Sequence, residues 1–87
     1  MAYILLVDPN EIAGKAMKGV LARGSHRLAV AATTAEAWDF IQRNVGVDLV
    51  FVELKLAGEG GLALVKRLHR DNFLKLLPVV IYTGMPD

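Results

Sequence analysis

Predominantly apolar runs of strand length recur four times along the chain. They cover residues 3–7, 27–32, 48–52 and 78–83. A continuous apolar run of this length is typical of a strand that is buried on both faces. The pattern therefore predicts four buried strands, separated by more polar sequence.

The segments between these runs carry apolar residues at helical spacing. The first helix is expected to begin after Asn10, a residue type that caps helices well, and to end at Gly24. The second is expected to open with the Thr-x-x-Glu capping box that Thr33 and Glu36 form, and the third to cover about residues 62–69. Strands and helices thus alternate throughout the chain.

This alternation predicts an α/β fold with a parallel sheet and helices on both of its faces. The carboxyl ends of parallel strands lie at one edge of the sheet, where such folds collect functional groups. Three polar side chains stand at strand ends: Asp8 after the first, Glu53 after the third, and Thr83 at the end of the fourth. The sequence therefore predicts a site at that edge.

Composition limits the classes of function. With 87 residues, of which 54% are hydrophobic, the chain is expected to form one domain with a real core. A formal net charge of +1 gives no electrostatic footprint for nucleic acid or a membrane surface, and the absence of cysteine excludes thiolate chemistry. No apolar run approaches the roughly 20 residues that span a bilayer, and no signal peptide is recognised, so the expected location is cytoplasmic.

Several other features carry weaker signals. The glycine cluster that ends at Gly61 is not followed by Gly-Lys-Ser/Thr, so a P-loop is rejected and a turn with positive φ is expected. His26 and His69 lack metal-ligand spacing, and Tyr82, whose side chain points away from that of Thr83, is expected in the core. A small α/β enzyme is not indicated, because no nucleophile–base pair or cofactor fingerprint is present.

The order and spacing of ILLVD, DLVFVELKL and LPVVIYTG resemble the receiver domain of bacterial response regulators, the flavodoxin-like module of two-component signalling. The resemblance covers the whole chain and implies a doubly wound parallel sheet with strand order 2-1-3-4. Because family members continue into a fifth strand and helix, it also implies that residues 1–87 are a receiver-like domain that is incomplete at its C-terminus.

The resemblance assigns roles to individual residues. In the family, two acids after the first strand and a phospho-accepting Asp after the third hold Mg²⁺. Asp8 matches the first of the paired acids, whereas Pro9 stands where the second commonly lies. Glu53 occupies the phospho-acceptor position, Lys55 the position whose backbone carbonyl is a metal ligand, and Thr83 that of the switch hydroxyl.

Two of these departures weaken the chemistry that the resemblance implies. Glu is one methylene longer than Asp, so Glu53 should carry its carboxylate past the acceptor position, and a displacement near 1 Å can cost about a hundredfold in rate. Pro9 supplies no metal ligand, which leaves Mg²⁺ binding possible but weak. We therefore expect a degenerate receiver, or pseudo-receiver, that is not an enzyme and that takes part in phosphorelay signalling through protein contacts.

Alternatives remain open on the sequence alone. The leading alternative is a working phospho-acceptor with Mg²⁺-dependent phosphorylation at Glu53. The plainest alternative is that no site exists, and that Asp8 and Glu53 are solvated residues at the ends of their strands. The expected partners are a histidine kinase, an output domain or a second copy of the chain, the last through an exposed edge of the fourth strand. No membrane or nucleic-acid partner is expected.

Overall fold

The alternation of elements follows the hydrophobic pattern. The computed structural model describes residues 1–43, 46–56 and 60–83. Among these residues no helix combines the length and the apolar composition that crossing a membrane requires. The seven predicted elements are all confirmed, in the order β1 (Tyr3–Val7), α1 (Glu11–Ala22), β2 (Arg27–Ala31), α2 (Thr34–Arg43), β3 (Leu49–Glu53), α3 (Gly61–Arg70) and β4 (Val79–Tyr82).

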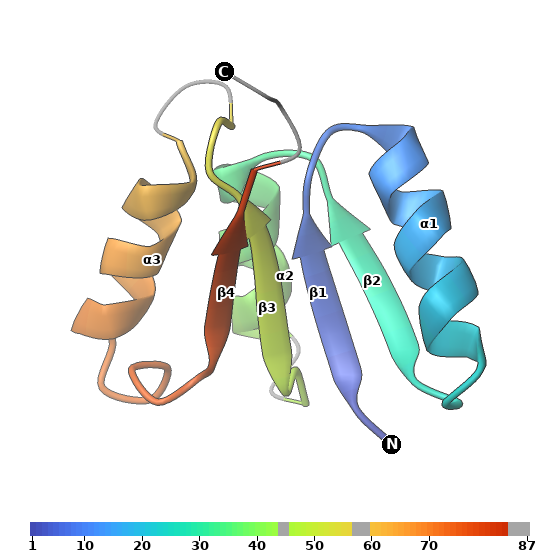
Figure 1. The fold of residues 1–87 in the computed structure, drawn as a ribbon. Coiled ribbons are helices and arrows are strands. Elements are labelled where there is room, and N and C mark those ends of the chain that lie inside the picture. Colours follow the sequence, from blue (N-terminus) through green and yellow to red (C-terminus); the bar gives the residue numbers. More distant parts are fainter. Residues whose placement is uncertain (44–45, 57–59, 84–87) are drawn as a thin grey trace.

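The strands form one parallel sheet in the order β2-β1-β3-β4 (Figure 1). This confirms the α/β class and the strand order that the resemblance implies. All four arrowheads point the same way, so the carboxyl ends of β1, β3 and β4 lie together at the upper edge of the sheet in Figure 1. That edge is where the sequence predicts a site.

The core lies between the sheet and the helices α2 and α3. Alternate side chains of the central strands point into it, because successive residues of a strand face opposite sides. Leu5, Val7, Val50 and Val52 have no exposed surface. Their partners from the helices are also buried, with exposed fractions between 0 and 2%: Ala37, Ile41, Leu64 and Leu68.

The helix α1 covers the opposite face of the sheet incompletely. It has no fully buried residue, and Ile12 and Val20 are 75% and 68% exposed. An apolar groove runs between α1 and the strands β3 and β4, lined by Ala13, Ala16, Met17, Val20, Leu21, Phe51, Val80 and Tyr82. The helical periodicity of α1 is therefore confirmed, while half of its apolar face stays open to solvent.

The predicted helix caps are confirmed in their main features. The side-chain oxygen of Asn10 accepts a hydrogen bond from the Ile12 N–H at 2.8 Å, and Thr33 Oγ1 accepts one from the Glu36 N–H at 3.1 Å. The Glu36 carboxylate closes the capping box one residue further back than usual, because it accepts from the Ala32 N–H at 2.9 Å.

Gly60 and Gly61, just before and at the start of α3, are needed for two different reasons, and the sequence predicted only the first. Gly60 has a φ of +79°, as expected for a turn. At Gly61 the prediction of positive φ is wrong, since this residue begins α3 and is needed for close packing: a Cβ there would lie 2.5 Å from the carbonyl oxygen of Glu53. The remaining glycine of the cluster, Gly58, lies outside the described residues.

We expect Gly61→Ala to lower the free energy of unfolding by about 1–3 kcal/mol, because the added methyl group must displace the backbone after β3. Gly19→Ala is the matched control, since a Cβ there meets nothing within 4 Å. In the middle of α1 it should stabilise the fold by up to about 1 kcal/mol. Urea denaturation of both variants measures the difference, and equal effects would contradict the packing argument.

Candidate functional site

The register of the sheet places three side chains in one row at its carboxyl edge. Val7 pairs with Val52, so Asp8 and Glu53, the next residues along, stand side by side. Glu53 in turn pairs with Tyr82 of β4. Residues in one row of a parallel sheet project from the same face, which brings Asp8, Glu53 and Tyr82 together.

Asp8 is buried, with 6% of its surface exposed, and both of its carboxylate oxygens accept hydrogen bonds. Oδ1 accepts from the Asn10 N–H at 2.8 Å, and this bond turns the chain from β1 toward α1. Oδ2 accepts from the Tyr82 hydroxyl at 2.5 Å. Asp8 therefore connects the end of β1 to the start of α1 and to the end of β4.

Glu53 is the last residue of β3 and is also only 6% exposed. Its Oε1 accepts a hydrogen bond from the Lys55 N–H at 3.1 Å, so the side chain turns toward its own loop. The interpretation of Asp8 and Glu53 as solvated strand-end residues is therefore wrong. Both are buried carboxylates that backbone N–H groups hold in place, as buried charges require.

Tyr82 was expected in the core, and that prediction is wrong in part. Its ring lines the apolar groove beside α1, whereas its hydroxyl reaches the acids. Burial raises the pKa of this phenol well above its ordinary value of 10.0, and the hydrogen bond to Asp8 with the negative charges of Asp8 and Glu53 raises it further. The hydroxyl is thus a protonated donor at neutral pH. The register of β3 and β4 is the signal that identifies Tyr82 as a residue of the site, because this register puts Tyr82 opposite Glu53.

The remaining predicted residues lie close to this row. Thr83 is exposed and directly follows β4, whose last carbonyl, that of Tyr82, accepts from the Leu54 N–H at 2.7 Å. Lys55 is exposed in the turn after β3, and Pro9 is exposed in the turn after β1. The switch role of Thr83 and the ligand role of the Lys55 carbonyl stay predictions.

The residues present do not fit the Mg²⁺ site that the resemblance implies. Mg²⁺ requires near-octahedral oxygen ligands, commonly carboxylates and water. In the part of the chain that the structure describes, no three His, Cys, Asp or Glu side chains come together in a way that could hold a metal ion. Pro9 contributes no carboxylate, and Asp8 already accepts from two donors.

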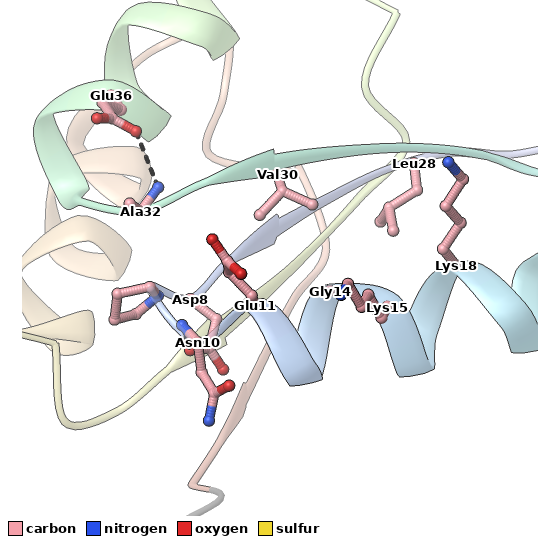
Figure 2. A pocket seen from close by; sticks show the side chains of 11 residues that line it. Asp8, Asn10, Glu11, Gly14, Lys15, Lys18, Leu28, Val30, Ala32 and Glu36 are labelled. Atoms are coloured by element: carbon pink, nitrogen blue, oxygen red, sulfur yellow. Dashed lines mark hydrogen bonds between the residues drawn. The ribbon is translucent and has the colours of Figure 1, made fainter.

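Figure 2 shows the hollow that adjoins Asp8 between α1 and β2, with a volume of about 710 Å³. Leu28 and Val30 of β2 form an apolar wall. Charged side chains of both signs surround it, with Glu11, Lys15, Lys18 and Glu36 among the lining residues. Because these charges nearly balance, the hollow offers no strong electrostatic preference for an anion or a cation.

The chain belongs to the response regulator receiver domain family, whose pattern matches residues 4–87. It is 25% identical over 82 residues to a rice protein described as two-component response regulator-like PRR37, and 27% identical over 81 residues to chemotaxis protein CheY1 of Helicobacter pylori. These matches cover 93% and 92% of this chain, but only 11% of the rice protein and 65% of the Helicobacter protein.

Solved structures agree with this assignment. The HemR receiver domain of Leptospira biflexa superimposes with a TM-score of 0.83 at 29% identity, covering 100% of this chain and 68% of that one. A response regulator receiver protein from Pseudomonas putida has a TM-score of 0.88 at 21% identity, covering 99% of this chain and 70% of its own, and it supports the fold alone. The predicted family is therefore confirmed.

The raised pKa of Tyr82 predicts a specific pH dependence of stability. Below about pH 10 the phenol is protonated in the folded and the unfolded protein, so its contribution is constant. Above that pH the unfolded chain releases the proton while the folded protein keeps it, and the stability falls as pH rises. Tyr82→Phe lacks this proton.

We expect the free energy of unfolding of the parent protein, relative to Tyr82→Phe, to stay level from about pH 8 to about pH 10 and then to fall by up to about 1.4 kcal/mol per pH unit. Urea denaturation of both proteins in EDTA measures it. Parallel pH profiles would show that Tyr82 keeps an ordinary environment.

Proposed function

We propose that this receiver domain signals through protein contacts without accepting a phosphoryl group. Receiver domains interact with kinases and output domains. The observation that carries the proposal is the geometry of Glu53, which fills the acceptor position with a longer side chain whose carboxylate accepts the Lys55 N–H. The proposal is for a binding module rather than an enzyme.

Positioning supports this proposal. Transfer of a phosphoryl group to a carboxylate requires an in-line approach, and misplacement by about 1 Å costs about a hundredfold in rate. The Glu53 carboxylate is 6% exposed and is bonded to its own loop. An incoming phosphoryl group would therefore have to displace a hydrogen bond and meet an oxygen that is offset by one methylene.

Electrostatics supports it as well. Such a transfer gathers negative charge between the acceptor and the neighbouring acids, and that charge needs compensation. Asp8 stands beside Glu53 in the same row, while Pro9 brings neither a carboxylate nor a cation to the site. The described residues do not assemble the metal ligands that would supply the compensation.

The phosphorylation test uses the intact mass of the protein after rapid quenching from Mg²⁺ and acetyl phosphate. We expect no phosphoryl adduct on the parent protein, because Glu53 is misplaced and the metal ligands are incomplete. A phosphoryl adduct on the parent would overturn the proposal in favour of a working phospho-acceptor.

Two variants locate the defect in the same experiment. An adduct on Glu53→Asp alone would assign the defect to the extra methylene of Glu53. An adduct that requires Glu53→Asp together with Pro9→Asp would show that the lost acid is a second cause. Glu36→Asp is the matched control, since it makes the same change of side chain at a position in α2.

A contact between two copies through β4 is a further part of the proposal. In the sheet that the described residues form, β4 is an edge strand, and edge strands offer unpaired N–H and C=O groups (Figure 1). Val80 and Ile81 on this strand are 41% and 39% exposed. Two identical edges are able to pair across a two-fold axis, which gives a closed dimer.

Sedimentation velocity over a range of protein concentrations tests this contact. We expect the parent to associate, and Ile81→Lys to shift the protein toward the monomer, because a charge on an edge strand opposes pairing. Ile12→Lys is the matched control, since Ile12 is 75% exposed on α1, and it should behave as the parent does. A parent that stays monomeric throughout, or equal effects of the two variants, would contradict a β4 contact.

A further inference from the structure

The Tyr82–Asp8 hydrogen bond joins groups that are 74 residues apart in the sequence and two strands apart in the sheet. Strands in a sheet lie about 4.8 Å apart, so a side chain on β4 must be long to cross β3 and reach Asp8. The tyrosine side chain has that length and ends in a donor. The contact depends on this residue type at this position in the row.

The ring of Tyr82 has apolar surroundings that do not involve its hydroxyl. It lines the apolar groove, together with Met17 of α1 and Val80 two residues earlier on β4. Removing the hydroxyl alone, as in Tyr82→Phe, leaves these apolar surroundings unchanged.

The hydroxyl presents its hydrogen to the second carboxylate oxygen of Asp8. Oδ1 of Asp8 is committed to the Asn10 N–H, and Oδ2 to the Tyr82 hydroxyl. A cation such as Mg²⁺ binds a carboxylate oxygen at about 2.0–2.1 Å, which is the space that the phenol hydrogen fills. The cation and the phenol hydrogen, both positive, would compete for the same oxygen.

We propose that Tyr82 closes the acid site, with its hydroxyl as the permanent partner of Asp8 in place of a divalent cation. The hydrogen bond and cation binding then compete at Asp8, and each weakens the other. The misfit between these residues and Mg²⁺ thus has a second cause besides Pro9. The inference rests on the proposed function only for the identity of the site, and a cation titration without a phosphodonor tests it separately.

The test measures cation binding by the parent and by Tyr82→Phe, with Mn²⁺ as the probe. Mn²⁺ prefers carboxylate and water ligands, and it broadens the NMR signals of nearby nuclei. The amide signals of Asn10 and Lys55 report on the site, because these amides donate to Asp8 and Glu53. Each protein is titrated with Mn²⁺ alone, and folding is checked by the dispersion of the same spectra.

We expect the two amides in Tyr82→Phe to broaden at a concentration of Mn²⁺ about tenfold or more lower than in the parent. A hydrogen bond to a charged group has the strength to change a binding constant by this factor. Adding Asp8→Asn to Tyr82→Phe should remove the gain, because Asp8 is the ligand that is released.

Tyr3→Phe is the matched control. Tyr3 begins β1, so it lies at the opposite edge of the sheet, where its ring packs edge-on to Phe40. This variant loses a hydroxyl as well and should titrate as the parent does. Equal Mn²⁺ concentrations for the parent and Tyr82→Phe would overturn the inference, whether both bind or neither does.

A phosphorylated parent together with a tenfold gain in Tyr82→Phe would overturn the proposed function and leave this inference standing. An unphosphorylated parent with no gain in Mn²⁺ binding by Tyr82→Phe would leave the proposed function standing and overturn this inference. The two experiments therefore separate the two claims.

Discussion

Parallel pairing of β3 with β1 on one side and β4 on the other determines what the carboxyl edge of the sheet contains. Burial on the core face fixes the register of this pairing, because Val50 and Val52 must enter the core between the sheet and its helices. A slip of one residue would expose them and bury the opposite face. With the register set by apolar burial, Asp8, Glu53 and Tyr82 have to share one row.

Two buried carboxylates in neighbouring positions need partners, since an uncompensated buried charge is costly. The fold supplies backbone N–H groups from the turns after β1 and β3, and one phenol from β4. The close packing of Gly61 against the Glu53 carbonyl fixes the second of these turns. The acids are thus held by donors that the chain itself provides, and each donor lies within three residues of a strand end.

The sequence predicted the parts of this arrangement that depend on local pattern. Apolar runs located all four strands, and Asn10 and Thr33 marked the starts of two helices. The resemblance then placed Asp8 and Glu53 at the same site. What it missed was Tyr82, because alternation along a strand tells only the side from which a residue projects. Its reach across β3 to Asp8 depends on the register of three strands.

The same distinction explains the other departures. The helical spacing of α1 predicted a helix correctly, but the burial of Ile12 and Val20 depends on what covers that face of the sheet. Periodicity describes which residues share a face and not whether the face has a partner. Likewise, the glycine pattern predicted the turn at Gly60, whereas the requirement at Gly61 arises from backbone that lies eight residues earlier.

A site of this kind changes what can drive a conformational response. A ligand shifts an equilibrium only by the difference in its affinity for the two states. If the Tyr82 hydroxyl satisfies Asp8, a cation supplies less of that difference at the row of acids. A partner that binds elsewhere on the domain is then another source of it. The ring of Tyr82 lines the groove beside α1 while its hydroxyl holds Asp8, so one side chain connects this apolar groove to the buried acids. A contact that moves this ring would reach the site without any chemistry at Glu53.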